Sequence, residues 1–181
     1  MNLNTSKIGL CSTMSCGKTT LVHALQELPE FNEYKFQTER SVYLRDLGIP
    51  LNTDSTINGQ IIFCAERSSE LLQPKIITDR SIIDVMAFTE CSKTMSRKEK
   101  NKIIEMASLL IPQYDHLFYI PPDGVLLTDN RVRYTDPEYR DLIDYTIRKI
   151  LLKYKSSIKN LHTISGSTEN RISQIKQIVF L

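Results

Sequence analysis

Several common signatures are missing from this chain of 181 residues. Its four cysteines form no CxxC pair and no Cys/His spacing typical of zinc, which argues against a zinc site or a disulfide framework and favours free thiols in a reducing cytosol. No apolar run approaches the roughly 18 residues that a membrane-spanning helix needs. The first ten residues resemble neither a signal peptide nor a transit peptide. We therefore expect a soluble, cytoplasmic protein with no membrane partner.

A strong net charge is also missing, since 23 basic residues face 21 acidic ones. This balance gives no global reason to expect binding to nucleic acid or to a membrane surface. The sequence contains no internal repeat, no low-complexity segment and no sign of a second domain. We expect residues 1–181 to form a single domain.

Short apolar runs alternate with helical patterns along the chain. The runs are continuous, which is typical of strands in a parallel sheet covered by helices on both faces, so we predict a three-layer α/β fold. The five predicted strands cover 7–11, 34–38, 75–79, 116–120 and 161–165. The predicted helices cover 17–28, 55–72, 81–90, 96–110, 137–155 and 167–179. Two helix starts carry capping patterns, Ser96 with Glu99 and Asp136-Pro137.

The segment CSTMSCGKTT, residues 11–20, lies between the first predicted strand and the first predicted helix. It matches the phosphate-loop pattern GxxxxGK[ST] except that Ser12 stands where the first glycine belongs. Backbone N–H groups of such a loop surround a phosphate at a helix N-terminus, the lysine reaches the β- and γ-phosphates, and the threonine hydroxyl binds Mg²⁺. The predicted nucleotide-binding residues are Ser12, Thr13, Met14, Ser15, Cys16, Gly17, Lys18, Thr19 and Thr20. The alternative is a chance GKT at a helix start.

Asp79 ends the third predicted strand, and ligands of such folds gather at the carboxyl ends of the strands. A carboxylate there can hold Mg²⁺ together with Thr19, and Arg80 can face a phosphate or an acidic substrate. The alternative is a surface ion pair, or a cap for the helix that begins at Ser81.

The polar segment 123–135 has the character of a mobile lid. Arg131 and Arg133 within it can close on transferring phosphates, because the planar guanidinium binds phosphate bidentately. A lid that excludes water favours a kinase, although a solvated loop is the simpler interpretation. A GTPase would carry an NKxD-like motif, which 159–161 does not match, and an AAA-type motor would need a larger chain with an arginine finger acting between subunits.

A family resemblance rests on segments that span most of the chain in the expected order: 12–21, 38–40 (TER), 58–60 (NGQ), 77–84 (ITDRSIID), 114–122, 131–140 (RVRYTDPEYR) and 164–172. The sequence resembles small P-loop nucleoside and nucleotide kinases, including the nicotinamide riboside kinase-like and phage deoxynucleotide kinase-like branch. The resemblance implies ATP with Mg²⁺, a five-stranded parallel sheet and an arginine-bearing lid. It also implies that the loop at Gly166 packs on adenine, where a strand-to-helix turn with a serine cap is the plainer interpretation.

The phosphoryl acceptor is not determined by these motifs. For a hydroxyl acceptor, Glu39 is the candidate general base; for a monophosphate, the candidate clamps are Arg40, Arg45 and Arg80. The alternative for Glu39 and Arg40 is an exposed charge pair at a helix start. Gln60 can read a nucleobase edge or be a solvated helical residue. Stacking on a base is possible for Tyr43 and Phe63, but core packing is the simpler expectation.

Two basic stretches leave other acceptors open: Lys93, Arg97, Lys98, Lys100 and Lys102, then Arg148, Lys149, Lys153, Lys155 and Lys159. A kinase acting on DNA, either on a polynucleotide end or on a hydroxymethylated base, would use such stretches, although charged helix faces are usually just solvated. A nucleotide-binding regulatory ATPase without a small-molecule acceptor is the remaining alternative. We expect a monomer or a homodimer.

Overall fold

The computed structural model of the protein describes residues 5–38, 40–122 and 136–180. Its centre is a parallel sheet of five strands in the order β2-β3-β1-β4-β5. The strands are β1 (Ser6–Cys11), β2 (Lys35–Gln37), β3 (Lys75–Thr78), β4 (His116–Tyr119) and β5 (Leu161–Thr163). The helices are α1 (Lys18–Gln26), α2 (Ser41–Asp46), α3 (Ile57–Glu70), α4 (Ile82–Cys91), α5 (Arg97–Ser108), α6 (Pro137–Lys153) and α7 (Thr168–Phe180).

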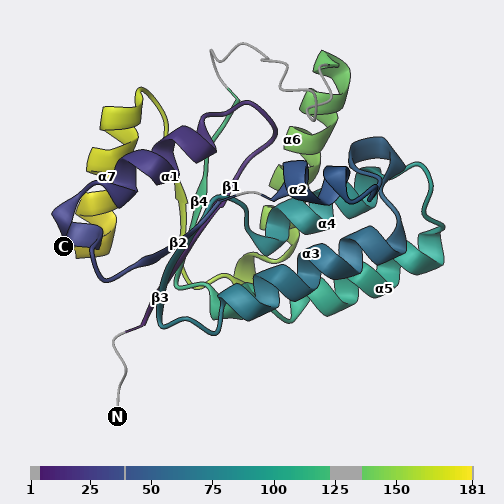
Figure 1. The fold of residues 1–181 in the computed structure, drawn as a ribbon, viewed down its shortest axis with the longest axis horizontal. Coiled ribbons are helices and arrows are strands. Elements are labelled where there is room, and N and C mark those ends of the chain that lie inside the picture. The colour runs from purple at the N-terminus through teal and green to yellow at the C-terminus, as the bar shows by residue number, and fades with distance from the viewer. Residues whose placement is uncertain (1–4, 39, 123–135, 181) are drawn as a thin grey trace.

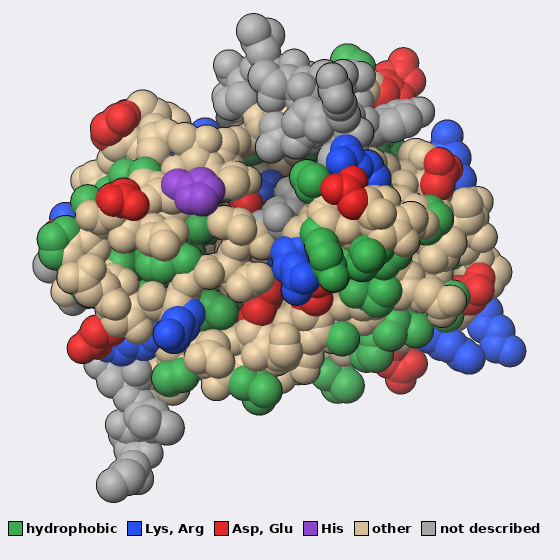
Figure 2. Space-filling model, in the orientation of Figure 1, with side chains coloured by type: hydrophobic (Ala, Val, Ile, Leu, Met, Phe, Trp, Pro, Cys, Tyr) green, Lys and Arg blue, Asp and Glu red, His purple; other side chains and the backbone are tan. Residues whose placement is uncertain are grey.

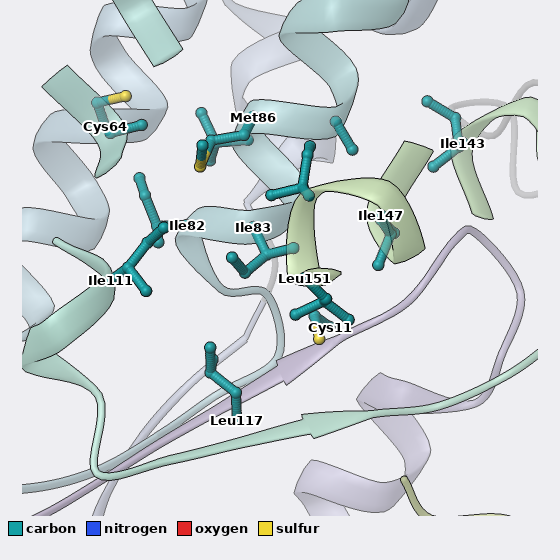
Figure 3. Packing of buried hydrophobic residues seen from close by; sticks show 14 of the residues in the cluster. Cys11, Cys64, Ile82, Ile83, Met86, Ile111, Leu117, Ile143, Ile147 and Leu151 are labelled. Carbon is teal, nitrogen blue, oxygen red and sulfur yellow. The ribbon is translucent and has the colours of Figure 1, made fainter. Parts of the chain in front are cut away.

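Helices cover both faces of the sheet (Figure 1), as predicted. On one face α1 and α7 pack over a buried cluster that includes Leu10, Leu21 and Ile175. On the other face α3, α4, α5 and α6 enclose a larger cluster. Figure 3 shows side chains of α4 and α6 directed toward Cys11 and Leu117 on the sheet. The continuous apolar strands are thus explained by burial on both sides.

The predicted strands and long helices are confirmed to within a few residues at their ends. Ser96 and Glu99 form the predicted capping box of α5, and Asp136 caps α6 with Pro137 in the first turn. No periodicity predicted the helix α2, because its six residues are too few, although the alternative for Glu39 and Arg40 placed a helix start there. Among the described residues, no helix is long and apolar enough to cross a membrane.

All five strands run in the same direction, so their carboxyl ends meet at one edge of the sheet. The segments that follow β1 and β3, residues 12–17 and 79–81, therefore lie side by side, and Asp84 of α4 bridges them through the Ser12 and Ser81 N–H groups. This edge is where ligands bind in open α/β sheets.

Candidate active site

The loop between β1 and α1 has the geometry of a phosphate-binding nest. Ser15 and Gly17 both have left-handed backbone conformations, with φ of 57° and 77°. Left-handed residues in such a loop turn successive N–H groups toward a common centre, and here the loop leads straight into the N-terminus of α1. The predicted strand–loop–helix context of GKT is therefore present.

Ser12 adopts an ordinary backbone conformation, because Ser15 and Asn52 are the non-glycine residues with positive φ in the described ranges. The position does not need glycine. Its hydroxyl lies 2.8 Å from the Lys18 ammonium, which also donates to the carbonyls of Ser12 at 3.0 Å and Thr13 at 2.9 Å. Lys18 is only 5% exposed. The loop that would bind the phosphate thus also binds the Lys18 ammonium.

Thr19 and Asp79 meet at the mouth of this loop. The Thr19 hydroxyl donates to Asp79 Oδ2 at 2.5 Å, and the second oxygen, Oδ1, is buried without a hydrogen-bond partner in the described structure. Asp79 does not cap α4, since Ser81 does so itself in a capping box with Asp84. A hydroxyl and a carboxylate with a vacant lone pair suit Mg²⁺, a hard cation that takes few protein ligands beside phosphate oxygens.

Asp84 links the two loops and was not foreseen. It accepts the Ser12 N–H at 3.3 Å and the Ser81 N–H and hydroxyl at 2.9 Å each, and it lies 3.8 Å from Arg80 Nη1. Burial raises the pKa of its carboxyl group, while Lys18 and Arg80 oppose that rise. The available signal was the spacing Ser81-x-x-Asp84, which is a capping-box pattern.

A pocket opens beside the phosphate loop. Its walls come from the loop, from α2, α3 and α4, and from the segment around Asn52. The lining residues are Met14, Ser41, Leu51, Asn52, Ser55, Gln60, Phe63, Arg80, Asp84, Val85 and Phe88. Met14 and Arg80 also line the hollow formed by residues 14–19. The pocket and the phosphate loop are thus contiguous.

Three side chains give the pocket its chemical character. Gln60 is 2% exposed, and its Oε1 has no hydrogen-bond partner within the described structure. The guanidinium of Arg80 lies 5.0 Å from the centre of the Phe88 ring. Such a pocket offers an apolar slot with an amide and a cation at its walls, which is typical of small-molecule sites.

Not all of the predicted acceptor residues line this pocket. Gln60, Phe63 and Arg80 do, whereas Arg40 pairs with Glu66 at 3.4 Å and Arg45 with Asp46 at 2.6 Å, outside the pocket lining.

Tyr43 corrects one expectation, because it does not pack in the core. It is 51% exposed, and the Arg40 guanidinium lies over its ring, 4.7 Å from the ring centre.

The predictions for Glu39, Arg131, Arg133 and the lid at 123–135 fall outside the described residues. Arg140 of α6, the helix that follows this segment, contacts the phosphate loop. Arg140 donates to the Pro122 carbonyl at 2.8 Å, and its own carbonyl accepts the Thr13 hydroxyl at 3.1 Å.

The loop after β5 contains Gly166 with φ of 91°, followed by Ser167, whose hydroxyl accepts the Asn170 N–H at 3.3 Å. This is the strand-to-helix turn with a serine cap, and contact with adenine stays a prediction. The helix it starts brings an unforeseen residue to the site: Arg171 donates to the Cys16 carbonyl at 2.6 Å. Nothing in the local sequence marks this contact across the fold.

A family model described as an AAA domain matches residues 7–171. This description gives no substrate and no reaction, so it does not decide between a motor and a kinase. A search of curated proteins found no match.

Solved structures show the same fold. Deoxyadenosine kinase from M. mycoides with bound dCTP superimposes with a TM-score of 0.67 and 15% identity, over 96% of this chain and 98% of that one. NadR protein in complex with NR superimposes with a TM-score of 0.75 and 12% identity, over 98% of this chain but 52% of that one. This chain therefore spans about half of NadR, and it shares the fold of both structures.

Proposed function

Because the chain belongs to the AAA domain family of P-loop proteins, we propose that it binds ATP at residues 12–20 and, with Mg²⁺, transfers the γ-phosphoryl group to a nucleoside or (deoxy)nucleoside monophosphate. The main support is the contiguity of the phosphate loop and the pocket through Met14 and Arg80. Phosphoryl transfer needs donor and acceptor to be held in line with little other chemistry, and two adjoining sites with a shared cation meet that need.

Each loop residue has a proposed role that follows from its position. The N–H groups of the loop and the Lys18 ammonium hold the β- and γ-phosphates, while Thr19 and Asp79 hold Mg²⁺, which neutralises charge on the phosphates when bound. Arg80, between the two sites, faces the transferring group. Glu39 as base and Arg131 and Arg133 as lid cations complete the proposal as predictions from the sequence.

The pocket favours a nucleoside over a monophosphate. Among the described residues that line it, Arg80 is the one cation, and Asp84 lies beside it. A dianionic phosphate would draw on more than one cation. Gln60, Phe63 and Phe88 suit an uncharged base, which both kinds of acceptor carry. The buried Gln60 Oε1 needs a donor, so an exocyclic amino group is the base feature it fits best. The similar structures are of a deoxyadenosine kinase and of NadR with NR, which agrees with this choice.

DNA as acceptor has less support. The basic stretches lie mainly on α5 and α6, and none of their residues lines the pocket. On the face shown in Figure 2, side chains of both signs are interspersed, with no broad basic area. This alternative and the regulatory ATPase are outcomes of the same test.

A transfer assay with γ-labelled ATP and Mg²⁺ tests the proposal. Separate pools contain nucleosides, deoxynucleoside monophosphates, nicotinamide riboside, and DNA with ordinary or hydroxymethylated bases. We expect label in a nucleoside pool, and a loss of about 100- to 1000-fold in Lys18→Ala, because the phosphates lose a preorganised cation. The exposed Lys35→Ala serves as the control and should match the wild type. Label on DNA alone, or free phosphate alone, would refute a small-molecule kinase.

A further inference from the structure

The rear of the phosphate loop is occupied by an arginine from the far end of the chain. Arg171 of α7 is 7% exposed, and its Nη1 donates to the Cys16 carbonyl at 2.6 Å, across 155 positions of sequence. Close packing of α7 on α1, the helix that the loop starts, brings it there. Figure 1 shows α1 and α7 together on one side of the sheet.

This hydrogen bond orients one peptide group of the loop. The Cys16–Gly17 peptide is trans, so its C=O and N–H point in opposite directions. With the carbonyl held toward α7, the Gly17 N–H points away from Arg171, and Gly17 lines the hollow formed by residues 14–19. A Cβ at position 17 would lie 3.3 Å from Arg171 Nη1, so the absence of a side chain permits the close approach. Glycine also adopts the backbone φ of 77° at position 17 without the steric cost that a side chain would bring.

The second property of Arg171 is its charge. The guanidinium carries a positive charge. Within the described parts of the chain it forms no ion pair, and its Nε has no hydrogen-bond partner, so a neutral carbonyl is its one recorded acceptor. A buried cation without a counterion is unfavourable, and an anion nearby relieves that cost. A phosphate in the loop is such an anion.

We propose that Arg171 is a positioning residue for the nucleotide: it orients the Cys16–Gly17 peptide and supplies a buried positive charge behind the phosphate loop. The proposal rests on the proposed nucleotide binding, and it requires no transfer step. It differs from the role of Lys18, because Arg171 acts through the backbone of the loop and from its opposite side.

The test compares Arg171→Met, which keeps most of the side-chain length without the charge or the donors, with Arg171→Lys, which keeps the charge without the planar fork. Arg97→Met is the control, since Arg97 is an exposed arginine on α5 that pairs with Glu90. The measured quantities are the Kd of a fluorescent ATP analogue with Mg²⁺ and the unfolding midpoint without ligand. We expect Arg171→Met to raise Kd by about 10- to 100-fold, Arg171→Lys to raise it less, and Arg97→Met to leave it unchanged.

The ligand-free midpoint separates positioning from a structural role. We expect the midpoint to change by no more than about 2 °C in Arg171→Met. Losing the hydrogen bond destabilises the fold, whereas removing a buried cation stabilises it, so the two effects oppose each other. If the midpoint falls further and binding at low temperature equals that of the wild type, Arg171 is structural and the proposal is wrong. An unchanged Kd with an unchanged midpoint refutes it as well.

Together with the transfer assay, these measurements distinguish a failure of this inference from a failure of the proposed kinase function. A wild type that binds the analogue but transfers nothing to any acceptor refutes the kinase, while a raised Kd in Arg171→Met still supports the positioning role. A wild type that binds no nucleotide refutes both.

Discussion

At the scale of single residues, the Lys18 ammonium is hydrogen-bonded to its own loop when no nucleotide is bound. Three oxygens of Ser12 and Thr13 accept from its ammonium, and one of them is a side-chain hydroxyl that a glycine at position 12 would not provide. A phosphate must compete with these acceptors for the same cation. We therefore expect Ser12, the residue that departs from the phosphate-loop pattern, to affect the strength of the proposed phosphate binding more than the shape of the loop.

Ser12→Ala is expected to lower the Kd for ATP with Mg²⁺ by about 3- to 10-fold, because Lys18 then leaves two internal acceptors instead of three. The backbone of Ser12 is ordinary, so alanine fits without strain. Isothermal titration measures the change, and Ser12→Gly should give a similar value. Weaker binding in Ser12→Ala would mean that the hydroxyl contacts the nucleotide itself.

At the scale of elements, the central strand β1 admits no side chain at Gly9. A Cβ there would lie 2.7 to 2.9 Å from ring carbons of Tyr114 and a methyl of Leu117. Tyr114 is buried, and its hydroxyl accepts the Ile82 N–H at 3.1 Å in the first turn of α4. The ring cannot move without disturbing the start of α4.

Gly9→Ala should therefore destabilise the protein by about 1–3 kcal/mol through overpacking of the sheet against Tyr114. Urea unfolding followed by circular dichroism measures the loss. Gly48→Ala is the control: nothing lies within 4 Å of its Cβ, so its cost is limited to about 1–2 kcal/mol from a positive φ. A Gly9→Ala variant as stable as wild type would show that the strand shifts freely.

Helix α3 carries a buried charge pair that supports the pocket. Arg67 binds Glu70 at 2.6 Å and donates to the Arg80 carbonyl at 3.1 Å. Burial raises the pKa of Glu70 from 4.5 to about 7, although Arg67 opposes the rise. Since the folded state holds this proton more tightly than the unfolded state, stability from Glu70 is full below about pH 4.5 and is lost as the pH rises to 7.

We expect the free energy of unfolding of the wild type to lose about 2 to 3 kcal/mol from this group between pH 4.5 and 7. Glu70→Gln, which cannot titrate, should show a correspondingly flatter profile in urea titrations at several pH values. The exposed Glu105→Gln serves as control and should keep the wild-type slope. A Glu70→Gln profile parallel to that of the wild type would contradict the raised pKa.

Prediction from sequence succeeded where the signal is local. Strands, caps and the phosphate loop each depend on residues adjacent in the chain, and the structure has them where the patterns predict. Sequence patterns did not predict α2, because six residues set up no periodicity. They also did not single out Asp84 and Arg171. Their contacts with the loop cross 72 and 155 positions, and such contacts follow from how helices pack on the sheet.

At the scale of the whole molecule, the two layers of helices meet different parts of the candidate site. The layer of α1 and α7 supports the phosphate loop, whereas α2, α3 and α4 from the other side form the pocket. Nucleotide binding should therefore tighten the layer of α1 and α7 and raise the stability of the whole fold by linkage.

ATP with Mg²⁺ at about 100 times its Kd should add about 2.7 kcal/mol, which corresponds to about 5 to 10 °C in the unfolding midpoint. Part of this shift needs Mg²⁺. Thr19→Ala should lose the Mg²⁺-dependent part, measured as the difference between ATP with Mg²⁺ and ATP with a chelator, while Thr19→Ser should keep it. Retention of the full difference in Thr19→Ala would exclude Thr19 as a metal ligand.

The hydrogen bond from Arg171 to Cys16 also has a consequence for the nascent chain. The loop leaves the ribosome early, but the helix that braces it is synthesised 155 residues later. At typical rates of translation this delay is about 8 to 30 s. During that interval the loop lacks the Arg171 hydrogen bond, so under the proposed role of Arg171 the nascent chain should bind ATP more weakly than the finished protein.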